Sequence, residues 1–246
     1  MKPTLLNTRP QHQAAQLDTQ CAAAGYTSLS CPALAMIPQT LDHRPNWDEQ
    51  DVWVFVSRNA VTHFAAQLRH NQACKVNAKL VAVGDATAQA IGEQAWPNLQ
   101  PVPDSFDSEG MLSMPVFAQP KGLRVGVVRG DGGRELLAQT LVQQGAEVRF
   151  YEVYQRQPLP FCDQAWLLFK RADCPVLLFT SASSLQAFWS QLPANEQAWC
   201  QQQILIVFSS RIEQAARELG FCAQIIQTQT SSDDAVLQAL NQLAKA

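Results

Sequence analysis

Short apolar runs alternate with longer helix-like segments along most of the chain. The runs are almost continuously apolar and rich in β-branched residues, which is typical of strands buried on both faces of a sheet. Strands are expected at 5–6, 52–56, 80–83, 125–128, 176–179 and 204–207, and helices at 11–24, 59–69, 85–95, 133–144, 183–192 and 210–219. This alternation predicts an α/β fold in which helices flank parallel sheets.

The chain also contains an internal repeat. An offset of 124 positions aligns Phe55 with Phe179, Ser57 with Ser181, Val83 with Val207 and Ser108 with Ser232. A second offset, of 120 positions, aligns Leu5 with Val125, Arg9 with Arg129, Leu17 with Leu137 and Gly25 with Gly145. The first offset holds without a gap over more than fifty residues, which indicates a duplicated structural unit.

The order of the two offsets predicts two similar domains, one of them discontinuous. Residues 42–146 form one complete unit, and residues 1–34 with 159–246 form the other. The chain then crosses between the domains twice, at 35–41 and 147–158. We expect these segments to pair as a two-stranded antiparallel linker with a cleft between the domains, where ligand sites are favoured.

Small polar residues, a glycine and arginines follow the predicted strands. Ligands gather at the carboxyl ends of parallel strands, where helix N-termini offer free N–H groups and a partial positive charge. The candidates for substrate binding are Arg9, Ser57, Arg58, Asn59, Thr87, Ser108, Arg129, Gly130, Arg134, Thr180, Ser181, Ser183 and Ser209. Each serine or threonine alone is also explained as a helix N-cap, but their number, together with the arginines, predicts a ligand with many carboxylates.

Composition excludes several classes of function. A net charge of −3 and 16% charged residues do not suggest the basic face of a nucleic-acid-binding protein. The chain has no apolar stretch of membrane-spanning length and no signal peptide, so we expect a cytoplasmic protein without a membrane partner. No apolar stripe or heptad suggests a dimer, so we expect a monomer.

Metal and nucleotide chemistry also find little support in the sequence. The seven cysteines form no C-x-x-C pair and the four histidines lack ligand spacing, so we expect reduced cysteines and no metal. The glycine-rich segment 129–134 lacks the G-K-[ST] ending of a phosphate-binding loop. A nucleotide-dependent α/β enzyme is therefore a weak alternative.

Several segments together resemble the uroporphyrinogen-III synthase family, and the likeness extends over essentially the whole chain. They are RGDGGRELL at 129–137, GAEV at 145–148, VYQR at 153–156, VFVSRNAV at 54–61, AVGDATA at 82–88, SEGML at 108–112 and FTSAS at 179–183. Each motif is degenerate, and their order and spacing carry the resemblance. The chain departs from the family's usual residues at Val56 and at 208–211.

The resemblance implies a cofactor-free lyase that closes hydroxymethylbilane, a linear tetrapyrrole with acetate and propionate arms, into uroporphyrinogen III in heme biosynthesis. Such an enzyme acts mainly by holding the two ends of its substrate together, and general acid catalysis helps water to leave. The match makes Tyr154 the candidate for that acid. The other interpretation is that Tyr154 only packs the linker.

A non-catalytic, hinged small-molecule binding module on the same scaffold is the main alternative. The set formed by 57–59, Thr87, 129–130 and Tyr154 favours the enzyme, because an inactive relative would be expected to lose several of these residues. The porphyrin isomer formed from hydroxymethylbilane discriminates between the two.

Overall fold

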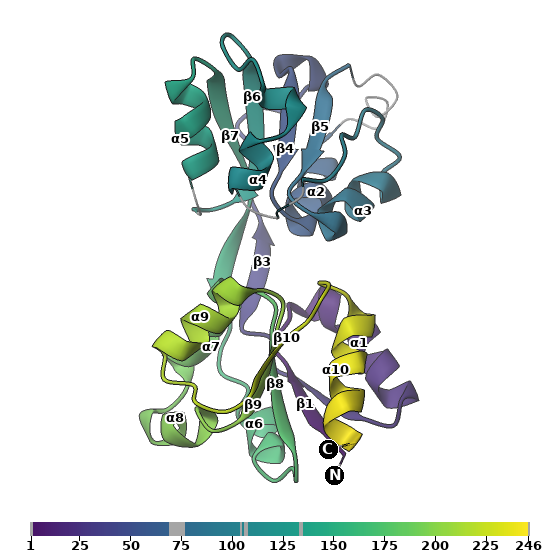
Figure 1. Ribbon diagram of the computed structural model, residues 1–246, viewed down its shortest axis with the longest axis vertical. Helices are drawn as coiled ribbons and strands as arrows, with labels where there is room; N and C mark the ends of the chain where they lie inside the picture. Colours follow the sequence, from purple (N-terminus) through teal and green to yellow (C-terminus); the bar gives the residue numbers. More distant parts are fainter. Residues whose placement is uncertain (1, 69–76, 104, 106–107, 133–134, 246) are drawn as a thin grey trace. The chain divides into compact units, whose positions relative to one another are not determined.

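The computed structural model shows two α/β units (Figure 1). It describes all residues except 1, 69–76, 104, 106–107, 133–134 and 246. One unit consists of Met1–Ala35 with Gln157–Ala246, and the other of Met36–Arg156. The unit boundaries fall inside the two segments predicted to cross between domains, whereas the linker role of those segments and the cleft stay predictions.

The first unit is a five-stranded parallel sheet in the order β10-β9-β8-β1-β2. Its elements are β1 (Thr4–Asn7), α1 (Gln11–Ala23), β2 (Thr27–Ser30), α6 (Asp163–Phe169), β8 (Pro175–Phe179), α7 (Ala182–Gln191), α8 (Ala194–Cys200), β9 (Ile204–Val207), α9 (Ser210–Glu218), β10 (Ile225–Gln227) and α10 (Asp233–Lys245). Alternate strand residues face opposite sides, so Leu6 packs with α6, α7 and α9 while Leu5 packs with α1 and α10. Both faces of the sheet are therefore covered, as in doubly wound folds.

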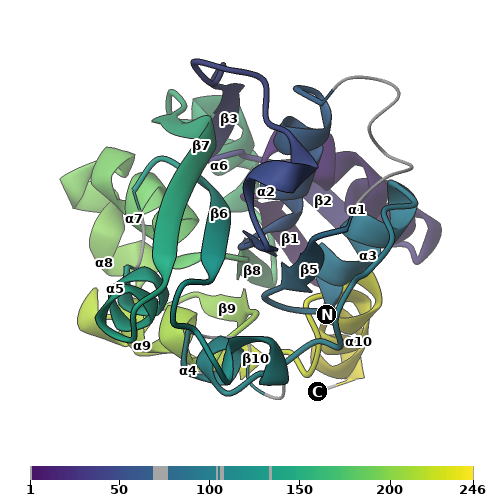
Figure 2. The same ribbon diagram turned by 90° about the horizontal axis from the view of Figure 1, so that it is seen from above.

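The second unit repeats this arrangement with a sheet in the order β3-β7-β6-β4-β5. Its elements are β3 (Leu34–Pro38), a 3₁₀ turn (Trp47–Glu49), β4 (Val52–Phe55), α2 (Arg58–Ala65), β5 (Lys79–Ala82), α3 (Asp85–Glu93), α4 (Ser108–Leu112), a second 3₁₀ turn (Pro115–Phe117), β6 (Arg124–Gly130), α5 (Leu136–Gln143) and β7 (Glu147–Pro158). Helices α2 and α3 cover the face that carries Trp53 and Phe55, and α4 and α5 cover the face that carries Val54 and Val127. Figure 2 shows β3, β7 and β6 of this sheet side by side.

Aligned residues of the internal repeat occupy equivalent places in the two sheets. Leu5 lies in β1 and Val125 in β6, each an interior strand of its sheet. Gly25 and Gly145 follow α1 and α5 with positive φ angles of 77° and 91°, the left-handed conformation in which glycine ends a helix without strain. The duplication seen in the sequence is therefore a duplication of local structure.

Strand β3 lies beside β7 at the edge of the second sheet. The Leu159 N–H donates to the Ala33 carbonyl over 3.1 Å, and the Gln39 N–H donates to the Val153 carbonyl over 3.0 Å. Residue numbers fall along one segment as they rise along the other, so the two segments run antiparallel. Parallel pairing holds the rest of both sheets together.

A disulfide joins Cys31, just after β2, to Cys162, just before α6. The prediction that all the cysteines are reduced is therefore wrong for this pair. The two cysteines are 131 residues apart in the sequence, and they meet because the pairing of β3 with β7 brings the flanking loops together. Spacing along the chain carries no sign of such a contact.

Among the helices that the structure describes, none has the length and apolar character needed to cross a membrane.

Candidate active site

Tyr154 lies in β7, at the last position that pairs with β6, and is 2% exposed. The register of β7 against β6 shifts between Arg129 and Gly130, so that Arg129 pairs with Glu152 but Gly130 pairs with Tyr154. This irregularity turns Tyr154 toward the face of the sheet that already holds Tyr151 and Val153. A local distortion of the strand therefore aims the phenol.

Gly130 makes room for the ring of Tyr154. A Cβ atom at position 130 would lie 2.4 Å from Tyr154 Cε2 and 2.5 Å from its Cζ, which is well inside van der Waals contact. The sequence predicts Gly130 as a substrate contact, whereas in the structure the absence of its side chain serves Tyr154. The role in substrate binding stays a prediction.

The Tyr154 hydroxyl contacts the side chains of Ser57 and Arg156. It lies 3.2 Å from Ser57 Oγ, and Arg156 Nη2 donates to it over 3.4 Å. Ser57 is the N-cap of α2, where its Oγ accepts the Ala60 N–H over 3.1 Å. The contact between Ser57 and Tyr154 was not predicted from the sequence, whereas the interpretation of Ser57 as a helix N-cap is confirmed. Substrate binding by Ser57 stays a prediction.

Arg156 is held in place by the turn that follows β6. Its backbone N–H donates to Asp131 Oδ1 over 2.8 Å, and its Nη1 donates to the Asp131 carbonyl over 2.6 Å. The Asp131 N–H in turn donates to the Tyr154 carbonyl over 2.9 Å. Sequence reasoning missed both residues as site members, although Arg156 lies two positions after Tyr154 on the same strand, where side chains share a face.

Arg129, at the carboxyl end of β6, is buried with an exposed fraction of 8%. Its Nε and Nη2 donate to Glu152 Oε1 over 3.2 and 3.0 Å, and its guanidinium lies 3.7 Å from the centre of the Phe150 ring. Its Nη1 is buried without a hydrogen-bond partner among the described residues. A buried donor left unpaired costs about 1–3 kcal/mol, so a carboxylate oxygen from a ligand would be favoured there.

In the first unit, Arg9 is the repeat partner of Arg129 and, like it, is paired with a carboxylate. Arg9 is 6% exposed, forms an ion pair with Asp233, and lies 5.2 Å from the centre of the Phe208 ring. The Asp233 carboxylate comes from the start of α10, and only the structure reveals this pairing. Both repeat-related arginines thus have a carboxylate partner, and binding of a substrate carboxylate by Arg9 stays a prediction.

The remaining predicted residues differ in how accessible they are. Arg58 forms an ion pair with Glu93 at 3.6 Å, and Ser181 caps α7 by accepting the Ser184 N–H over 3.1 Å. Thr87 and Ser108 are buried. The half-buried residues are Asn59, Thr180, Ser183 and Ser209. Arg134 lies outside the described residues. Substrate binding by all of these residues stays a prediction.

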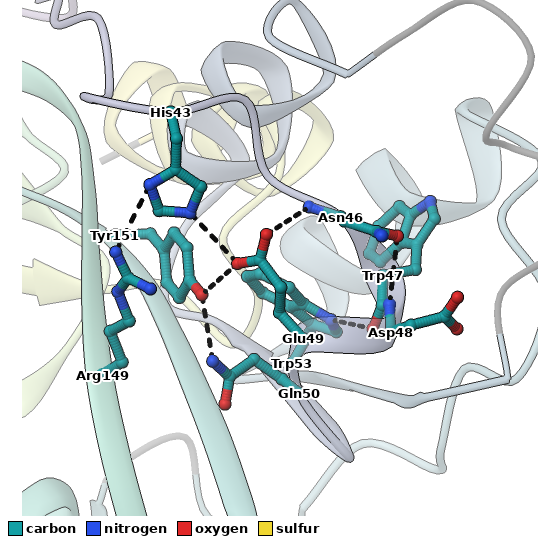
Figure 3. A network of polar contacts seen from close by, with 9 residues as sticks. All are labelled: His43, Asn46, Trp47, Asp48, Glu49, Gln50, Trp53, Arg149 and Tyr151. Carbon is teal, nitrogen blue, oxygen red and sulfur yellow. Dashed lines mark hydrogen bonds and ion pairs between the residues drawn. The ribbon is translucent and has the colours of Figure 1, made fainter.

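A second polar network of the Met36–Arg156 unit includes Arg149 and Tyr151 of β7 (Figure 3). Tyr151 donates to Glu49 and accepts from Gln50, each over 2.9 Å, while His43 lies between Glu49 and Arg149. Burial raises the pKa of the Tyr151 phenol. Because ligands favour the other edge of a parallel sheet, we interpret this network as structural.

The same unit also contains two cavities. One, of about 320 Å³, is lined by Glu49, Gln50, Arg124, Glu147, Val148 and Arg149. The other, of about 370 Å³, is lined by Gln39, Thr40, Leu41, Asp42, Phe150 and Glu152. Tyr154 lines neither, so the candidate site rests on the contacts of its side chains.

The chain resembles known proteins over nearly its full length. The family model described as "Uroporphyrinogen-III synthase HemD" matches residues 15–236. The uroporphyrinogen-III synthase of Salmonella typhimurium is 32% identical over 96% of this chain and 99% of its own. The enzyme of the same name from Escherichia coli K12 is 31% identical over the same shares of the two chains.

Solved structures of uroporphyrinogen III synthases share the fold of this chain. A mutant uroporphyrinogen III synthase from Thermus thermophilus matches with a TM-score of 0.65 over 100% of both chains. The synthetase from Helicobacter pylori 26695 matches with a TM-score of 0.66 over 99% of this chain and 100% of its own. Sequence identity is 16% in both cases, so these likenesses support the fold alone.

Proposed function

Because the chain belongs to the uroporphyrinogen-III synthase family, we propose that it is a lyase that converts hydroxymethylbilane to uroporphyrinogen III in heme biosynthesis. Water leaves the hydroxymethyl group of the first pyrrole, and the last pyrrole attacks the resulting azafulvene through its substituted carbon. A spiro intermediate then rearranges, which inverts the last ring and closes the macrocycle.

The observation that carries this proposal is the placement of the Tyr154 hydroxyl. It lies at the carboxyl end of the β6–β7 pair, in contact with Ser57 and Arg156. Phenols are protonated at neutral pH and can donate a hydrogen bond or a proton. Tyr154 is therefore equipped to protonate the departing hydroxide as a general acid.

Substrate recognition is proposed to depend on the carboxylates of the four pyrroles. Arg129 supports this, since its buried Nη1 has no partner among the described residues and an arginine favours a carboxylate ligand. The N-terminus of α2, which Ser57 caps, offers a further place for a negative charge. Holding these arms in place brings the two ends of the substrate together, which supplies most of the catalysis.

The test is the rate at which Tyr154→Phe consumes hydroxymethylbilane. We expect kcat to fall by about 100-fold, as for the loss of a general acid, while isomer III remains the product because positioning is intact. Tyr26→Phe is the matched control: it removes the same atom from a hydroxyl that donates to Asn241 over 2.6 Å in the other unit. Equal rates for the wild type and Tyr154→Phe would eliminate Tyr154 as the acid.

We also propose that the protein is a monomer and works in the cytoplasm. Light scattering after size-exclusion chromatography and cell fractionation test these two points.

A further inference from the structure

The Tyr154 hydroxyl contacts Arg156, which can only donate hydrogen bonds, and Ser57, which can donate or accept them. Arg156 has N–H donors and no acceptor, so the Tyr154 oxygen accepts from its Nη2. The hydroxyl of Tyr154 is then free to donate its own hydrogen to Ser57 Oγ, 3.2 Å away. With the Tyr154 hydroxyl as the donor, the hydrogen bonds run in one direction, from Arg156 through Tyr154 to Ser57.

Ser57 can reverse its part in this chain without losing its helix cap. A hydroxyl oxygen accepts two hydrogen bonds and donates one, and Ser57 Oγ already accepts the Ala60 N–H. When Tyr154 carries its proton, Ser57 accepts from it. When Tyr154 has lost its proton, rotation of the Ser57 hydroxyl lets it donate to the tyrosine oxygen while Ala60 continues to donate to Ser57.

We propose that Arg156 and Ser57 form a two-donor site for the Tyr154 phenolate, in which Arg156 is a positioning residue that promotes proton donation by Tyr154. The inference rests on the proposed function, because it concerns the acid of that reaction. It assigns the guanidinium of Arg156 to the tyrosine oxygen rather than to a substrate carboxylate. Preorganised donors aimed at a developing negative charge are a strong source of catalysis.

The proton balance of the step is complete within the protein and its substrate. The Tyr154 O–H bond breaks as the proton moves to the hydroxymethyl oxygen of the substrate, and the carbon–oxygen bond breaks to release water. The phenolate is then held by Arg156 and Ser57. When the last pyrrole regains its aromaticity after ring closure, it loses a proton, which returns to the Tyr154 oxygen and restores the neutral phenol.

The rigidity of Arg156 supports this role. Its backbone and one guanidinium nitrogen are held by Asp131, which leaves Nη2 directed at the tyrosine. Its guanidinium carbon also lies 5.5 Å from the centre of the Tyr154 ring. A lysine has no fork with which to contact Asp131 and Tyr154 together, so Arg156→Lys is expected to restore only part of the function.

A double-mutant cycle between positions 154 and 156 tests the inference through kcat and KM for hydroxymethylbilane. We expect Arg156→Gln to lower kcat about tenfold or more and to change KM less than about twofold, with partial recovery in Arg156→Lys. In a Tyr154→Phe background, Arg156→Gln should have no further effect on kcat, because the group through which it acts is gone. Arg124→Gln is the matched control, since Arg124 is also paired with an aspartate, Asp51, but at the start of β6.

Two results would overturn the inference. One is an effect of Arg156→Gln that persists in the Tyr154→Phe background or falls on KM, since that would place Arg156 on a substrate carboxylate. The other is wild-type kcat in both Arg156 variants while the wild-type protein makes isomer III, in which case the inference alone fails. If the wild-type protein yields only isomer I, the proposed function is wrong, and the inference, which depends on it, is wrong as well.

Discussion

Removing the disulfide between Cys31 and Cys162 is expected to destabilise the fold by an amount that reveals how the two units unfold. The bridge spans 131 residues, and the loop that it closes contains the whole of the Met36–Arg156 unit. If both units unfold together, the chain-entropy relation gives about 5 kcal/mol for a loop of this size. That is a large share of the total stability of a typical domain.

A smaller loss of stability is expected if the unit that holds both cysteines, Met1–Ala35 with Gln157–Ala246, unfolds while the other unit stays folded. The hydrogen bond from Gln39 to Val153 then keeps β3 beside β7. Only the short stretches from Cys31 to Gln39 and from Val153 to Cys162 remain loose, and together they amount to about 17 residues. The same relation then gives about 3 kcal/mol.

Urea unfolding of Cys162→Ser, followed by circular dichroism, measures this difference. Cys162 is half-buried, so serine is tolerated there better than at the buried Cys31. Reduction of the wild type should lower its stability to that of the variant, and reductant should not affect the variant. Cys222→Ser, at an exposed free cysteine, is the control. A loss below about 1 kcal/mol in both Cys162→Ser and the reduced wild type would refute the reasoning, because even the short loop predicts more.

Two further predictions concern packing and thiol chemistry. Gly130→Ala should lower the stability of the protein by about 1–3 kcal/mol through overpacking against the Tyr154 ring, and it should also lower kcat. Gly92→Ala in α3 is the control, since the space around Gly92 is open, and it should raise the stability by up to about 1 kcal/mol. Thermal unfolding and enzyme kinetics of both variants test these expectations. Burial, and then the charge of a neighbouring glutamate, raises the pKa of the Cys200 thiol to about 12, which keeps it from forming the reactive thiolate at pH 8. Iodoacetamide should therefore label Cys222 but not Cys200 in the folded protein, as peptide mass spectrometry would show, and rapid labelling of Cys200 would contradict its burial.

The sequence predicted the regular parts of the fold because their signals are local. Continuous apolar runs located β4, β6, β8 and β9 to within a residue or two, since buried parallel strands leave this pattern. The repeat located equivalent residues such as Ser57 and Ser181, both of which cap helices. The short strands β2 and β10 are half-buried or exposed, so they lack an apolar run and were missed.

The parts of the site that the sequence could not predict depend on contacts between distant segments. Asp233 pairs with Arg9 from 224 positions away, and Asp131 holds Arg156 from the turn that follows β6. The register shift that aims Tyr154 likewise leaves no local pattern. Sequence motifs indicated which residues could take part in the chemistry, but only the fold shows which of them contact one another.

The isomer composition of the product tests the central claim most directly. The purified wild-type protein is incubated with freshly generated hydroxymethylbilane, without added metal or cofactor, and the porphyrins are oxidised and separated. Mostly isomer III is the predicted result, since closure without the enzyme gives the uninverted isomer I. A product that is entirely isomer I would contradict the proposed function and favour a non-catalytic binding protein on the same scaffold.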